Sequence, residues 1–61
     1  MKNFFEVKSP DGGVVIYINI SEIQSLVATN DEAYIKFIHS EAEMPISLDS
    51  FKRLRKEIWG I

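Results

Sequence analysis

The segment "VVIYINI", residues 14–20, limits the possible folds more than any other part of this 61-residue chain. Side chains two positions apart lie on the same face of a β-strand, and the segment is apolar with that period. The strand divides into two faces: Val14, Ile16, Ile18 and Ile20 on one, and Val15, Tyr17 and Asn19 on the other. The second face is half apolar, so we expect it to be partly covered.

A turn signal comes directly before this strand. In "SPDGG", residues 9–13, Pro10 suits the first central position of a turn, and the two glycines tolerate positive φ. The preceding "NFFEVK" also alternates, with Phe5 and Val7 on one side and Phe4 and Glu6 on the other. The sequence therefore predicts a β-hairpin over its first 20 residues.

The next segments extend the sheet. "SEIQSLVAT" allows two interpretations: a tight helical turn at 21–23 followed by a strand over 24–29, or one short helix. Residues 33–39 predict another strand after the polar turn "TNDEA". A short last strand is expected at 44–47, and it should lie at an edge because Pro45 has no amide hydrogen.

The chain ends in a predicted amphipathic helix. Ser47 or Asp49 can cap its N-terminus, and Gly60 is a typical stop. Three- and four-residue spacing places one set of apolar side chains on the same side of the helix. These are Leu48, Phe51, Leu54, Ile58 and Trp59.

Together these elements predict one small α+β domain over residues 1–61: an antiparallel meander of about five short strands with one C-terminal helix packed on the sheet. The chain is near the lower size limit for independent folding. It has no cysteine and therefore no disulfide to add stability, although 46% of its residues are hydrophobic. We expect unusually good packing or self-association to supply the rest.

Composition also bears on the cellular compartment. No apolar run approaches the roughly 20 residues of a membrane span. "MKNFFEV" lacks the apolar core of a secretory signal, and the absence of cysteine is compatible with a reducing compartment. We therefore expect a cytoplasmic protein that is not attached to a membrane.

Charge is unevenly distributed along the chain. Residues 1–46 carry three basic and seven acidic residues, a balance of −4, whereas residues 47–61 carry four basic and two acidic residues, a balance of +2. The basic residues of the tail are Lys52, Arg53, Arg55 and Lys56. They allow two interpretations, a solvated outer helix face or a nucleic-acid-binding surface. Four cations are few beside the roughly 6–10 phosphate contacts of a strong DNA binder.

Groups able to do chemistry are sparse. His39 is the single histidine, and "HSEAE" spaces it two residues from Glu41 and four from Glu43. An imidazole with two carboxylates is a conceivable weak metal site, but the segment has the composition of a solvated loop. No nucleophile, base and orienting acid are brought together by spacing. We therefore expect no enzyme activity, no cofactor and no metal.

The stretch "INISEIQSLVATNDEAYIKF" resembles the FlbD family of small flagellar-operon proteins, over about residues 13–54. The similarity places an equivalent Asn, Ile, apolar residue, Ala-Thr pair and Asp at Asn19, Ile23, Leu26, Ala28, Thr29 and Asp31. This chain needs a one-residue shift before Ile35 and has "HSEAE" where that family has a glycine-bearing turn. The resemblance implies a small non-enzymatic protein.

The same stretch is more distantly similar to part of a LytTR-type DNA-binding domain. Those domains are longer and read DNA through basic loops, whereas the loops "SPDGG", "TNDEA" and "HSEAE" are acidic here.

The function that these observations predict is that of a non-enzymatic protein-interaction or regulatory module. Its expected partners are a second copy of itself, most simply as a dimer, and another protein. The expected contact residues are apolar groups that a one-sided core cannot easily accommodate: Phe4, Tyr17, Tyr34, Ile38 and Trp59. The alternative is a nucleic-acid-binding accessory protein that uses Lys52, Arg53, Arg55 and Lys56.

Overall fold

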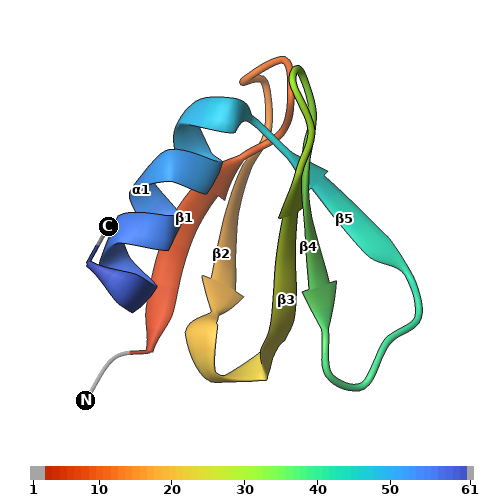
Figure 1. Ribbon diagram of the computed structural model, residues 1–61, viewed down its shortest axis with the longest axis vertical. Helices are drawn as coiled ribbons and strands as arrows, with labels where there is room; N and C mark the ends of the chain where they lie inside the picture. The colour runs from red at the N-terminus through yellow and green to blue at the C-terminus, as the bar shows by residue number, and fades with distance from the viewer. Residues whose placement is uncertain (1–2, 61) are drawn as a thin grey trace.

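The computed structural model describes residues 3–60 and contains five strands and two helical elements. Their order along the chain, shown in Figure 1, is β1 (Phe4–Lys8), β2 (Val15–Asn19), the 3-10 turn η1 (Ile20–Glu22), β3 (Ile23–Ala28), β4 (Ala33–Phe37), β5 (Glu43–Ile46) and α1 (Leu48–Trp59). The predicted α+β class, with antiparallel strands and one C-terminal helix, is confirmed.

The strands form two antiparallel sheets rather than one continuous sheet. β1 pairs with β2, and β4 lies between β3 and β5. The two sheets are joined at opposite ends of the first hairpin. η1 connects β2 to β3 at one end, and at the other the Ser47 N–H donates to the Lys8 carbonyl oxygen over 2.9 Å.

Helix α1 runs beside β1 in the opposite direction and covers the edge that β1 does not share with β2 (Figure 1). The Lys8 N–H donates to Ser50 Oγ over 2.9 Å, and Arg53 Nη2 donates to the Glu6 carbonyl oxygen over 3.4 Å. An uncovered strand edge offers unpaired N–H and C=O groups to other chains. The helix therefore protects this edge as well as closing the core.

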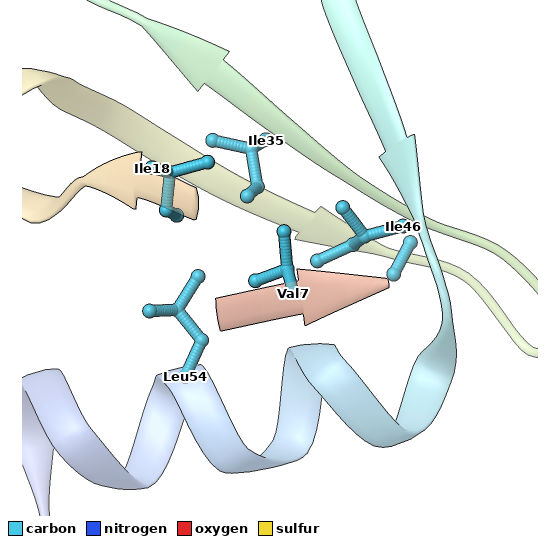
Figure 2. Packing of buried hydrophobic residues seen from close by; sticks show 6 residues of the cluster. Val7, Ile18, Ile35, Ile46 and Leu54 are labelled. Atoms are coloured by element: carbon cyan, nitrogen blue, oxygen red, sulfur yellow. The ribbon is translucent and has the colours of Figure 1, made fainter. Parts of the chain in front are cut away.

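The core is small and is assembled from every strand pair and the helix. Among residues 3–60 its buried apolar residues are Val7, Ile18, Ala33, Ile35, Ile46 and Leu54. Figure 2 shows Leu54 extending from α1 toward Val7 and Ile18, with Ile35 and Ile46 on the far side. Six buried apolar side chains are few for a folded domain, which fits the marginal stability expected at this length.

Local signals place the ends of these elements as predicted. Gly12, in the β1–β2 loop, has φ 77°. Glycine adopts this left-handed conformation without steric cost, because it has no Cβ. Ser47 is the N-cap of α1, because its Oγ accepts the Ser50 N–H over 3.1 Å. Gly60 ends the helix in the left-handed region with φ 75°. Pro45 lies in β5, which is an edge strand as expected.

Three local expectations are refined or corrected. The helical turn lies at Ile20–Glu22, one residue earlier than predicted, and a full short helix does not form there. Val14 precedes β2 and is exposed, so it does not share the inner face of the strand. Trp59 is 56% exposed rather than part of the apolar stripe. At 3.6 residues per turn it points about 140° away from Leu54.

Among residues 3–60, no helix combines the length and the apolar character needed to cross a membrane.

Candidate interaction surfaces

The outer side of the first hairpin exposes apolar side chains among polar ones, and we call it the outer hairpin face. The register pairs Phe4 with Asn19, Glu6 with Tyr17 and Lys8 with Val15, and these six residues define the face. Phe4 is 63% exposed, Tyr17 67% and Val15 47%. Phe4 and Tyr17 are diagonal neighbours across the two strands, a spacing at which aromatic side chains reach one another. Both aromatic side chains are thus exposed to solvent and within reach of each other.

The five predicted contact residues do not form one surface. Phe4 and Tyr17 lie together on the outer hairpin face. Tyr34 is half-buried on β4, between Val27 and Pro45 of the neighbouring strands. Ile38 is exposed in the turn after β4, and Trp59 is exposed at the end of α1. Val15, which the alternation of β2 places on the same side as Tyr17, is also part of the outer hairpin face.

The four basic residues of α1 lie along its outer side, with Lys52 and Lys56 between Arg53 and Arg55. The two arginines make contacts within the chain. Arg53 faces β1, where its guanidinium carbon lies 5.8 Å from the centre of the Phe5 ring. Its Nε also lies 3.5 Å from Asp49 Oδ2, one helical turn away. An arginine in these contacts covers apolar surface with its stem and satisfies its charge within the chain.

Arg55 lies on the opposite flank of the helix. Its guanidinium carbon is 5.6 Å from the centre of the Phe51 ring, and its Nε is buried without a hydrogen-bond partner among residues 3–60. Lys52 and Lys56 are exposed, and their side chains form no hydrogen bond or ion pair with any other residue in that range. Two of the four basic side chains are thus engaged within the chain, and the solvated-face and nucleic-acid interpretations both stay predictions.

A groove of about 300 Å³ lies where the β1–β2 and β3–β4 loops meet the start of α1. We call it the acidic groove, because two carboxylates and no basic residue line it. Its lining residues come from three separate parts of the chain: Pro10, Asp31, Glu32, Ala33, Tyr34, Pro45, Ile46, Ser47 and Leu48. The sequence analysis identified Tyr34 but not the groove, because only the fold brings these loops together.

One wall of the acidic groove is held by a side-chain hydrogen bond. The Tyr34 hydroxyl donates to Glu32 Oε1 over 2.7 Å. This bond raises the pKa of Tyr34 above its ordinary value of 10.0, and burial and the negative charges of Glu32, Glu43 and Asp31 act in the same direction. The phenol is therefore a neutral donor at physiological pH, and it feels a negative electrostatic environment.

The segment that contains His39 does not form a defined site among the described residues. His39 lies in the turn after β4, and its Nε2 is 3.9 Å from Glu22 Oε1 with both side chains largely exposed. Within residues 3–60, no three His, Asp or Glu side chains are grouped so that they could hold a metal ion.

Comparisons of the chain with protein-family models, with curated proteins and with solved structures found no match. The resemblance to the FlbD family, and the more distant one to LytTR-type domains, therefore stay predictions.

Proposed function

We propose that this protein is a small, non-enzymatic, cytoplasmic interaction module that forms a dimer through its outer hairpin face and binds a protein partner. The observation that carries the proposal is the exposure of Phe4 and Tyr17, at 63% and 67%, as neighbours on one face. Exposed aromatic groups that lie together are typical anchors of protein interfaces. A domain with so small a core also gains stability when this face is covered.

A second copy of the chain is a suitable occupant of this face. Glu6 and Lys8 lie on it two residues apart, with opposite charges. A two-fold axis that packs two such faces in opposite directions can place Glu6 of one copy near Lys8 of the other, twice. Such an interface is isologous, so the same patch serves both subunits and the assembly closes at two.

Size sets the expected strength of the dimer. A standard interface buries about 800 Å² on each partner. That area is about a fifth of the 4393 Å² accessible to solvent here. The outer hairpin face covers only part of this amount, even with the adjoining Val14. We therefore expect a weak dimer that dissociates at roughly micromolar concentration.

Sedimentation equilibrium over a hundredfold range of concentration tests the proposal. We expect the average mass to rise from monomer to dimer in the unmodified chain. Tyr17→Thr should shift this transition at least tenfold upward in concentration. Threonine suits a strand, so the change removes the aromatic contact without opposing the fold.

Val27→Thr is the matched control, because it places the same residue at another exposed strand position, on β3. It should leave the mass profile unchanged. A chain that stays monomeric at every concentration, or a control that weakens the dimer equally, would refute the outer hairpin face as the interface.

The same experiment with a short DNA duplex addresses the alternative function. Arg53 and Arg55 are held against Phe5 and Phe51, which leaves two lysines to contact phosphate. We expect no change of mass with DNA at moderate salt. A complex that forms at low salt, and is lost on Lys52→Glu, would instead support the nucleic-acid-binding accessory protein.

A further inference from the structure

The acidic groove has the size of a side-chain pocket. Its volume of about 300 Å³ is at the lower end of the range for ligand sites, roughly 300–1,000 Å³. Ala33 and Ile46 form a buried floor, and Pro10, Pro45 and Leu48 add rigid or apolar walls. Such a groove accommodates one or two side chains of an extended peptide better than a cofactor.

The electrostatics of the groove select the charge of its occupant. Asp31 and Glu32 line it, and neither forms an ion pair with any residue from 3 to 60. Lys36 is near in sequence, but the sheet register places it opposite Glu43, outside the lining. Two carboxylates without a counter-ion, beside apolar walls, complement a single positive charge on an apolar stem.

The ring of Tyr34 distinguishes between the two basic side chains. Its hydroxyl is held by Glu32, and Pro45 lies directly across the strand pair from it. A planar guanidinium can stack on an aromatic ring and bind a carboxylate through two parallel hydrogen bonds, whereas an ammonium group acts as a point charge. This combination favours arginine.

We propose that the acidic groove binds an extended segment of a partner protein that presents an arginine between proline or other apolar residues. The guanidinium would bind Asp31 and Glu32 and lie against Tyr34, and the flanking residues would contact Pro10, Pro45 and Leu48. Proline-rich extended segments commonly bind in grooves lined by aromatic residues. The inference rests on the proposed function only in naming the chemistry of the protein partner, and it does not depend on dimer formation.

The test is a titration of the isotope-labelled full chain with a short capped peptide, acetyl-APLRPA-amide, followed by amide chemical shifts. The matched probe carries citrulline in place of arginine, which keeps the shape and removes the charge. We expect the arginine peptide to shift amides of residues 31–34 and 45–48, and the citrulline peptide to bind at least tenfold more weakly. The titration is repeated on Tyr17→Thr, so that dimer formation does not affect the result.

The protein variant for this test is the double change Asp31→Asn with Glu32→Gln, which should weaken peptide binding at least tenfold. Its control is Glu22→Gln with Glu41→Gln, which removes the same charge away from the groove lining and should leave binding unchanged. The inference is overturned if the arginine peptide does not bind, if citrulline binds equally, if both double variants behave alike, or if the shifts lie on the outer hairpin face.

The two proposals can fail separately. A chain that stays monomeric but binds the arginine peptide in the groove would refute the dimer and support this inference. A chain that dimerises but does not bind the peptide would support the dimer and refute this inference.

Discussion

The two faces of the first hairpin have similar alternation and opposite environments. On the inner face Val7 and Ile18 are buried, whereas on the outer face Phe4 and Tyr17 remain nearly two-thirds exposed. The difference arises because α1 lies along the edge of β1 and directs Leu54 to the inner side (Figures 1 and 2). Nothing between residues 3 and 60 covers the outer side. Strand periodicity therefore supplies two candidate faces, and the docking of other elements decides which becomes the core.

The largest expected effect on stability comes from removing a buried side chain on the inner side of the hairpin. Leu54→Ala should lower the free energy of unfolding by about 2–5 kcal/mol, because it removes a fully buried side chain and leaves a cavity. The total stability of a chain this long is only about 3–9 kcal/mol, so the variant should be partly unfolded at room temperature. Urea unfolding followed by circular dichroism measures the loss. Val27→Ala, at an exposed position, is the control, and an equal loss there would contradict the division into faces.

The second test concerns the contact that positions the helix on β1. Ser50→Ala should cost about 1–3 kcal/mol, because the Lys8 N–H would lose the buried Ser50 hydroxyl that accepts its hydrogen bond. Ser40→Ala is the comparison, since Ser40 Oγ accepts the Ala42 N–H in an exposed loop where water can replace it. Thermal unfolding of both variants at the same protein concentration compares their losses of stability. Similar losses would mean that the Ser50 contact does not anchor the helix.

The two faces can be compared directly at neighbouring positions. Tyr17→Thr should change the stability of the dissociated chain by less than about 1 kcal/mol, since Tyr17 contributes little to the core. Ile18→Thr places the same residue on the inner face and should cost several times more, because it buries a hydroxyl. Unfolding is measured at dilute and concentrated conditions. The unmodified chain and Ile18→Thr, which keep the outer hairpin face, should gain stability with concentration, and Tyr17→Thr should gain less.

The smallest expected effect is in the β1–β2 loop. The Asp11 carboxylate accepts the Gly13 N–H over 2.9 Å and the Ser9 hydroxyl over 2.7 Å, and these bonds lower its pKa below the ordinary value of 3.8. Because the pKa is lower in the folded chain, the carboxylate stabilises the fold at a pH above 3.8. This contribution is lost as the pH falls below 3.8 through the lowered pKa.

The measurement is the urea midpoint between pH 6 and pH 2 for the unmodified chain and for Asp11→Asn. The difference between them should be constant above about pH 4 and should shrink below 3.8. A difference that grows on acidification would show that the charge of Asp11 opposes the loop.

Much of the fold could be predicted from short-range patterns. "SPDGG" indicated the first turn, Ser47 and Gly60 indicated the helix ends, and Pro45 indicated an edge strand. Each of these depends on the backbone preferences of one or two residues, so it does not need tertiary information. The expectation that Trp59 belongs to the apolar stripe was wrong, because helical spacing near a helix end does not determine where the last side chain lies. Its expected role as a contact residue stays a prediction.

The candidate interaction surfaces were harder to predict from the sequence than the secondary structure. Ser50 has the pattern of a surface residue in the first turn of a helix, and it is buried because α1 packs against β1, where its Oγ accepts the Lys8 N–H. Arg53 and Arg55 belong to one basic run, yet they contact aromatic rings on opposite flanks of α1. Helical geometry separates side chains two positions apart, so members of one charged run can contact different parts of the fold.

The sequence by itself determined the elements of this protein, their order, and the alternation that makes each strand two-faced. These properties follow from local preferences of the backbone and from the period of apolar residues. Only the tertiary structure decided which hairpin face is buried, how the sheet divides in two, and that Pro10, Tyr34 and Leu48 line one groove. Those outcomes depend on contacts between residues far apart in the chain, whose free energies are settled only when all the elements pack together.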